Sequence, residues 1–277
     1  MKTVVTHMSP DLDATTSVWL VRKYLPGWDS ASVAFVPAGT TLDNKDPDED
    51  ADIIHVDTGF GKFDHHQTNQ YMSAARLVHD YLKESEYIFK KDEDAVERLV
   101  EFVTVIDNFG EVHFFDPTAD VYDFSLHQLI IGIKSQLMND GKVVEHMTFL
   151  LESVLQVLKN KIRAEEDIQD GVVFTSRWGK SIAMQTRNEE ALRLALKSGY
   201  MLVLRKDPDR NFLNIKTFPK PENDLTPVYN KLKELDPEAS WFLHASTYIL
   251  LNGWVGRPDT HPTTLSLPQI VDIIKTL

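Results

Sequence analysis

Histidine and aspartate side chains recur in the first 110 residues at spacings that could build a metal centre. In chain order these residues are His7, Asp11, Asp13, Asp57, Asp64, His65, His66 and Asp107. Carboxylates and imidazoles together suit Mn²⁺, Fe²⁺, Co²⁺ or Zn²⁺ better than Mg²⁺, which favours oxygen ligands and water. So many ligands exceed the need of one ion, and two ions sharing a bridging carboxylate would use them. Such a pair can clamp the attacking and leaving oxygens of a phosphoryl group.

The elements around these residues indicate how they could converge. Three β-branched or apolar runs at 3–7, 31–39 and 53–59 are typical of buried strands. Apolar residues at helical spacing follow at 9–25, 73–82 and 93–107. This alternation predicts an α/β fold, a parallel sheet with flanking helices. Because ligands of open α/β sheets bind outside the carboxyl ends of the strands, we expect the polar residues after these strands to meet there.

The rest of the chain predicts a connector and a second domain. Apolar residues recur at helical intervals over 143–162, with no strand signal between 125 and 166. A hairpin pattern then begins at 171, followed by further strands and helices. We therefore expect a catalytic domain over 1–135, a helical connector over 136–168 and a smaller C-terminal α/β domain over 169–277.

Composition narrows the classes of function. The 277 residues include no cysteine, which excludes disulfides, thiolate zinc sites and cysteine nucleophiles. No apolar run is long enough to cross a membrane, and the first residues do not form a signal peptide, so we expect a cytoplasmic protein without a membrane partner. The net charge of −13 disfavours long nucleic acid and favours small or single-stranded substrates.

Each candidate ligand also has an ordinary structural explanation. Asp11 lies where a helix N-cap is expected, Asp57 could be a turn residue before Gly59, and an adjacent histidine pair is often only surface. Considered together, at successive element ends, the residues favour a shared metal site.

Four motifs in order, THMSPDLDA, VDTG, DHH and VIDN, resemble those of the DHH phosphoesterase superfamily. This superfamily includes RecJ-type nucleases, phosphodiesterases of short oligonucleotides and manganese pyrophosphatases. The segments DHHQ, VIDN and FLHAS also resemble, more weakly, the melanocyte-proliferating-gene family of exonucleases that act on RNA.

The resemblance implies a role for each residue. His7 and Asp11 would bind one metal ion, and Asp13, His65 and Asp107 the second. Asp57 would bridge the two ions, His66 would lie beside the attacked phosphate, and Asp64 would orient the histidines. The implied cofactors are two divalent ions, most naturally Mn²⁺, with Co²⁺, Fe²⁺ or Mg²⁺ as alternatives.

The second domain would hold the substrate. Its candidate phosphate-binding residues are Arg205, Lys216, His244 and Arg257. We expect the His244 imidazole, which lies within WFLHAS, to be partly buried and to need a partner.

The sequence thus predicts a two-metal phosphoesterase that hydrolyses phosphodiester bonds in nucleotides or short single-stranded oligonucleotides. Two alternatives stay open: a phosphoanhydride hydrolase such as a manganese pyrophosphatase, and a non-catalytic, metal-binding regulatory module. A homodimer is also compatible with the sequence.

Overall fold

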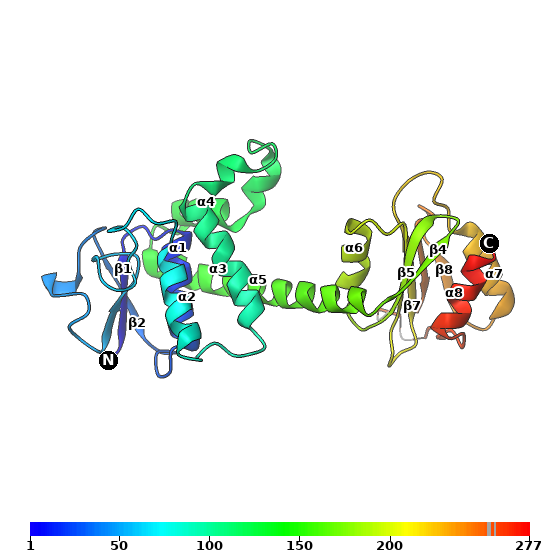
Figure 1. Cartoon of the computed structure of the whole chain (residues 1–277), viewed down its shortest axis with the longest axis horizontal. Helices are drawn as coiled ribbons and strands as arrows, with labels where there is room; N and C mark the ends of the chain where they lie inside the picture. Colours follow the sequence, from blue (N-terminus) through cyan, green and yellow to red (C-terminus); the bar gives the residue numbers. More distant parts are fainter. Residues whose placement is uncertain (254–255, 258) are drawn as a thin grey trace. The chain divides into compact units, whose positions relative to one another are not determined.

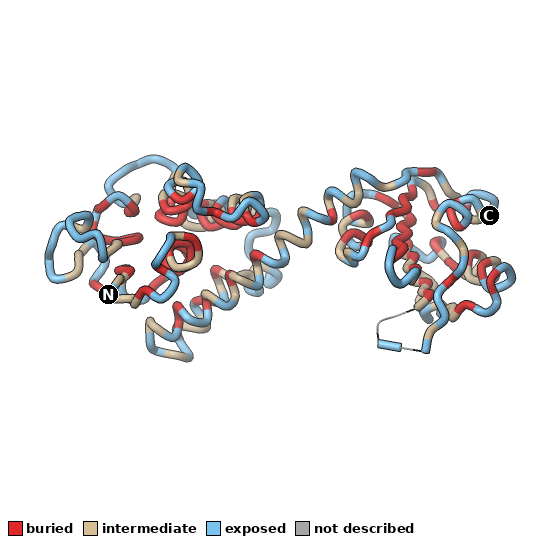
Figure 2. The backbone as a smooth tube through the Cα atoms, turned by 90° about the horizontal axis from the view of Figure 1, so that it is seen from below, coloured by how far each residue is buried: buried red, intermediate tan, exposed pale blue. Residues whose placement is uncertain are grey.

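The computed structural model describes residues 1–253, 256–257 and 259–277, which form two compact units, Met1–Lys159 and Asn160–Leu277 (Figure 1). Buried residues follow the strands and the inward faces of the packed helices in each unit (Figure 2). Helix α5 (Asp140–Gln169) includes the division between the units. Among the residues described, no helix combines the length and apolar character needed to cross a membrane.

Unit 1 is built on a parallel sheet of three strands. The strands are β1 (Thr3–His7), β2 (Ser32–Val36) and β3 (Ile53–His55). The α-helices before α5 are α1 (Leu12–Tyr24), α2 (Ala74–Glu84), α3 (Glu93–Asp107) and α4 (Leu126–Leu137). Short 3₁₀ turns are η1 (Leu42–Asn44), η2 (Gly110–His113) and η3 (Asp120–Phe124). The strand order β2-β1-β3 makes β1 central, and the predicted parallel sheet with flanking helices is confirmed.

Helix α1 is the centre of unit 1. Every residue from Leu12 to Val21 is buried, because the helix contacts β1, α2 and α3 together. Asp11 begins the helix as its N-cap and accepts a hydrogen bond from the Ala14 N–H at 3.0 Å. The packing therefore fixes the segment from the end of β1 to the first turn of α1, which carries three of the candidate ligands.

The third strand is shorter than the predicted range of 53–59. Ladder pairing ends at His55, and Asp57 takes a left-handed backbone conformation with φ of 56°. Its N–H donates to the Phe63 carbonyl at 3.0 Å, so the chain turns back towards the DHH segment. This turn, rather than the strand, aims the Asp57 carboxylate.

Unit 2 is a mixed sheet with helices on its two faces. Its strands are β4 (Val172–Ser176), β5 (Gly179–Gln185), β6 (Leu202–Lys206), β7 (Leu213–Thr217), β8 (Trp241–Leu243) and β9 (Ile249–Asn252). Its helices are α6 (Glu190–Lys197), α7 (Thr226–Leu235) and α8 (Leu267–Lys275), beside the end of α5. The strand order is β4-β5-β6-β7-β9-β8, with only β5 and β6 parallel. The predicted second α/β domain and its initial hairpin are confirmed.

Candidate metal centre

The end of β1 and the turn of Asp57 bring a first group of ligands together. His7 is the last residue of β1, and its Nε2 lies 3.2 Å from Asp57 Oδ2 and 3.9 Å from Asp11 Oδ2. The other ring nitrogen, Nδ1, contacts the Met8 carbonyl at 2.9 Å, which fixes the plane of the ring. His7, Asp11 and Asp57 each offer an atom within 4.8 Å of the others, which is the geometry of a metal site.

A second group lies against the other side of Asp57. His65 Nε2 is 3.3 Å from Asp107 Oδ2 and 3.7 Å from Asp13 Oδ2. The same nitrogen is 3.5 Å from Asp57 Oδ1. The two oxygens of Asp57 therefore face different groups, Oδ2 towards His7 and Oδ1 towards His65. One carboxylate shared in this way is suited to bridge two cations.

Backbone N–H groups hold Asp13 in place. The N–H groups of Ala74 and Ala75, at the start of α2, donate to its two oxygens at 2.7 and 2.8 Å. Ser73 caps α2 and bonds to Thr104 of α3 through their hydroxyls at 2.9 Å. A helix N-terminus favours negative charge, so α2 stabilises a carboxylate that is otherwise fully enclosed. These hydrogen bonds connect the first turn of α1, which contains Asp13, to α2 and α3.

Asp64 orients the DHH segment without joining a ligand group. Its Oδ1 accepts from the His66 N–H at 3.1 Å and contacts the His66 Nδ1 at 2.7 Å. Its Oδ2 accepts from the Phe60 N–H at 2.7 Å. The His66 ring is 55% exposed, and its Nδ1 lies 3.7 Å from Asp57 Oδ1. The imidazole thus stands at the open side of the cluster, available to a molecule that enters it.

Crowded carboxylates perturb the ionisation of the site. Burial raises the pKa of Asp107, and the charges of Asp57 and Asp11 help raise it to about 6, against the lowering effect of His65. Burial and the same kind of repulsion hold the pKa of Asp13 well above its usual range. Burial lowers the pKa of His7, but the hydrogen bonds to Asp57 and Met8 and the charges of Asp57 and Asp11 together outweigh it and raise the pKa to about 9. Protons here compensate negative charge that a divalent cation would neutralise.

Unsatisfied buried atoms test whether a cation fits. Asp57 Oδ1, His65 Nε2 and Asp107 Oδ2 are buried and have no hydrogen-bond partner among the described residues. Such atoms are costly unless something pairs with them, and these three point at one another. Carboxylate oxygens and imidazole nitrogens are ligands of Mn²⁺, Fe²⁺, Co²⁺ and Zn²⁺. The donor set therefore fits divalent transition metals, with Asp57 between the two groups.

Two of the four residues predicted to bind phosphate lie together in unit 2. Arg205 of β6 and Lys216 of β7 line a cavity of about 460 Å³ with Arg187, Arg210 and Asn214. The β6–β7 register pairs Arg205 with Asn214 and Val203 with Lys216, so these side chains share one face of the sheet. Val203 packs in the core under α6, and the cavity continues along the same face.

The cations of this cavity differ in their partners. Arg205 is buried; its Nη1 donates to the Thr186 carbonyl at 3.0 Å, and its Nη2 lies 3.3 Å from Glu189 Oε1. Burial lowers the pKa of Lys216, as do nearby guanidinium groups, with Arg193 the foremost. No ion pair engages Lys216 in the part of the chain that the structure describes. Lys216 is therefore the cation most in need of an anion.

The other two predicted residues lie elsewhere in unit 2. His244 and Arg257 are exposed, and neither is among the described residues that line the cavity. The expectation that His244 is partly buried is wrong. It follows the end of β8 rather than lying within a strand, and its Nδ1 is satisfied by the Ser246 hydroxyl at 2.8 Å.

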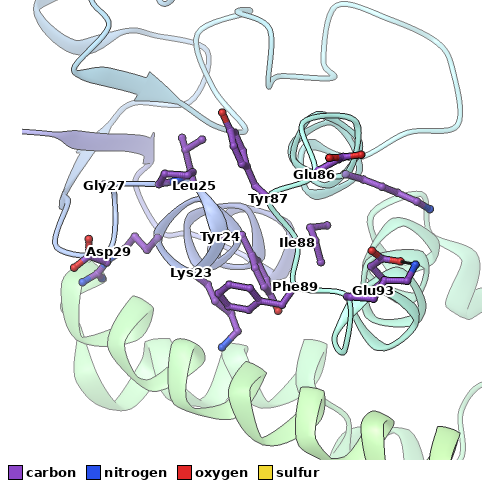
Figure 3. Close-up of a pocket in the computed structure, with 14 residues that line it drawn as sticks. Lys23, Tyr24, Leu25, Gly27, Asp29, Glu86, Tyr87, Ile88, Phe89 and Glu93 are labelled. Atoms are coloured by element: carbon purple, nitrogen blue, oxygen red, sulfur yellow. Dashed lines mark hydrogen bonds and ion pairs between the residues drawn. The ribbon is translucent and has the colours of Figure 1, made fainter.

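A further cavity of about 740 Å³ lies at the C-terminal end of α1, where Tyr24 and Phe89 border it (Figure 3). Its lysines are engaged: Lys23 with Glu152, Lys83 with Glu97 and Lys90 with Glu93. The candidate ligands do not line it, because they lie at the opposite end of α1.

The features that sequence reasoning missed are mostly backbone groups. The N–H clamp of Ala74 and Ala75 has one visible signal, a serine before the apolar pattern of α2, which is typical of an N-cap. Arg187 and Arg210 of the cavity lie outside the strands and carry no such signal.

Comparisons with known proteins give distant matches. No family model matches the sequence, and no curated protein matches it significantly. Similar solved structures include an uncharacterized protein from Helicobacter pylori, with 12% identity over 100% of this chain and 98% of that one and a TM-score of 0.29. They also include a DHH domain described as belonging to a family of ribosomal proteins (12% identity, 99% and 86% covered, TM-score 0.32). An exopolyphosphatase-related protein from Bacteroides fragilis matches at 11% identity, with 99% and 90% covered and a TM-score of 0.29.

The four motifs that resemble the DHH superfamily meet at one site in this fold.

Proposed function

We propose that this chain is a metal-dependent phosphoesterase that hydrolyses phosphodiester bonds in nucleotides or short single-stranded oligonucleotides. The observation that carries the proposal is that Asp57 lies between two ligand groups, with Oδ2 towards His7 and Oδ1 towards His65, and that three buried, unsatisfied atoms are directed into them. Two divalent ions held by these groups would polarise a phosphoryl oxygen and make hydroxide available near neutral pH. Mn²⁺ fits the mixed carboxylate and imidazole ligands best, with Co²⁺, Fe²⁺ and Mg²⁺ as alternatives.

The residues of the chain have distinct tasks in this proposal. His7, Asp11, Asp57, Asp13, His65 and Asp107 hold the cations. His66 faces outward beside Asp57, where it can donate a proton or hydrogen bond to a phosphoryl oxygen. Asp64, whose Oδ1 lies 2.7 Å from His66 Nδ1, holds the imidazole in place.

The cationic cavity of unit 2 supports a phosphorylated substrate. We infer that Lys216 binds an anionic oxygen there, because it is half-buried and no carboxylate pairs with it among the described residues. Arg205, held by Thr186 and Glu189, adds a fixed positive charge. Isothermal titration with inorganic phosphate tests this, comparing Lys216→Gln with a control, Lys220→Gln, that lies outside the cavity. We expect phosphate binding to be lost only in the Lys216 variant; equal binding in both would remove Lys216 from the proposal. His244 and Arg257 remain candidate phosphate ligands, to be tested in the same way.

The decisive experiment measures Mn²⁺-dependent hydrolysis of pyrophosphate, a dinucleotide and a short single-stranded RNA. Asp57→Asn removes the shared charge, and Asp43→Asn is the matched control, since Asp43 is an exposed residue of the 3₁₀ turn η1. Nucleotide release that is lost in Asp57→Asn and kept in Asp43→Asn would support a phosphodiesterase. Phosphate from pyrophosphate alone would assign the chain to the anhydride hydrolases. Metal binding without turnover of any substrate would leave a regulatory module.

A further inference from the structure

Two phenylalanines beside the metal centre are exposed and have an unusual backbone. Phe60 is 55% exposed and Phe109 is 73% exposed. Both adopt left-handed backbone conformations, with φ of 57° at Phe60 and 56° at Phe109. Bulky residues rarely take this conformation, and where they do the strain is maintained by the surrounding structure, often at functional sites. Neither burial nor backbone preference accounts for an aromatic side chain at these positions.

Phe60 is tied to the residues that face the substrate side of the centre. Its N–H donates to Asp64 Oδ2 at 2.7 Å, while Asp64 Oδ1 contacts His66 Nδ1, also at 2.7 Å. Its ring lies against Gly39, where an added Cβ would stand 3.4 Å from the ring carbon Cζ. One part of the ring is thus supported by backbone, and more than half of the residue stays open to solvent.

Phe109 lies close along the chain to another of the ligands. It follows Asp107 by two residues, so the two Cα atoms are at most about 7 Å apart. Asn108 between them is fixed, because its side-chain amide donates to the carbonyls of Met72 at 2.9 Å and Thr104 at 2.8 Å. The backbone of Phe109, whose side chain is exposed, is therefore held close to a ligand by a rigid turn.

We propose that Phe60 and Phe109 are stacking platforms for the nucleobases next to the scissile phosphate. This inference rests on the proposed function and deepens it, because it names a substrate with bases. Aromatic rings bind successive bases of single strands by stacking, which tolerates any base identity. Stacking also needs no positive surface, which suits a chain with a net charge of −13. The two phenylalanines would favour nucleotides over phosphate compounds without bases, and they would not discriminate between base sequences.

The test uses equilibrium binding as well as turnover. A short phosphorothioate oligonucleotide carrying 2-aminopurine is titrated with the whole chain in Mn²⁺, beside the same oligonucleotide with abasic positions. The proteins are the wild type, Phe60→Leu, Phe109→Leu and the control Phe115→Leu, which alters a phenylalanine that is 94% exposed and is not adjacent in sequence to a ligand. Leucine keeps apolar bulk and removes the ring face.

We expect the wild type and the control to quench 2-aminopurine and to bind the base-containing strand about tenfold more tightly than the abasic strand. Phe60→Leu and Phe109→Leu should each lose much of this preference and quenching, whereas Phe115→Leu should keep both. If both variants keep the wild-type preference, the platforms are refuted while the phosphoesterase proposal stands. If the wild type hydrolyses only pyrophosphate and binds neither strand, both proposals fail.

Discussion

Metal binding should change the stability of unit 1 by an amount that the structure allows us to work out. The ligand groups hold crowded carboxylates, and repulsion there helps raise the pKa of Asp107 to about 6. A cation that binds only the folded site stabilises it by about 2.7 kcal/mol when its concentration is 100 times the dissociation constant. Unit 1 spans Met1–Lys159. At roughly 2.1 cal/mol/K per residue, its unfolding entropy is about 0.33 kcal/mol/K.

These values predict a rise in the Tm of unit 1 of about 8 °C for one occupied site, and a larger rise when the second site, which shares Asp57, is also occupied. Calorimetry of the whole chain, first in chelator and then with saturating Mn²⁺, measures the shift. Unit 2 is an internal control, because the ligand groups lie entirely in unit 1. Its transition should move little.

The variants Asp57→Asn and Asp43→Asn complete this test. Asp57→Asn should lose most of the Mn²⁺-dependent rise in Tm. Asp57 belongs to two possible ligand groups, one with His7 and one with His65 and His66. Asp43→Asn should keep the full shift. Either of two results would refute the assignment of the metal centre. One is a wild-type Tm that does not change with Mn²⁺, and the other is an Mn²⁺-dependent rise in Tm that is as large in Asp57→Asn as in Asp43→Asn.

Three further changes have defined outcomes. Gly59→Ala should lower the free energy of unfolding by about 1–2 kcal/mol in urea, because φ is 84° and the new Cβ would lie 2.8 Å from Thr41 Cγ2; Gly132→Ala, with open space around it, should be neutral or stabilising. Burial lowers the pKa of His79, so the unfolded chain takes up a proton that the folded chain resists as pH falls below 6.5. In denaturation at pH 7.5 and 5.5, the stability of His79→Asn relative to the wild type should rise as the pH falls, because the other titrating groups act on both proteins alike; a difference between the two proteins that does not change with pH would contradict the reasoning. Asp64→Asn should reduce turnover about 10- to 100-fold while the Mn²⁺-dependent Tm shift persists; an equal loss of both would make Asp64 a ligand.

Much of unit 1 is readable from the sequence because its signals are local. Periodicity gave the strands and helices, and the rule that ligands gather at the carboxyl ends of parallel strands explains why His7 and Asp57 meet. The resemblance to the DHH superfamily supplied a division of the ligands into two groups, and the structure brings the same residues together. Their function as ligands remains a prediction for the metal experiments.

The parts that could not be predicted depend on tertiary contacts. The end of β3 at His55 follows from a hydrogen bond between Asp57 and Phe63, which no strand propensity encodes. The clamp on Asp13 uses the N–H groups of Ala74 and Ala75, and any residue type other than proline could supply these. His244 was expected to be partly buried from its apolar neighbours, but the strand ends before it.

The order of the ligands along the chain has a consequence for biosynthesis. Every residue of the proposed centre precedes Asn108, and unit 1 ends at Lys159, so the 118 residues of unit 2 remain to be made at that point. At about 5–20 residues per second, their translation takes roughly 6–24 s. Unit 1 has time to fold and acquire its cations while still attached to the ribosome. Ribosome-bound chains that present only unit 1 should then already resist proteolysis better in Mn²⁺ than in chelator.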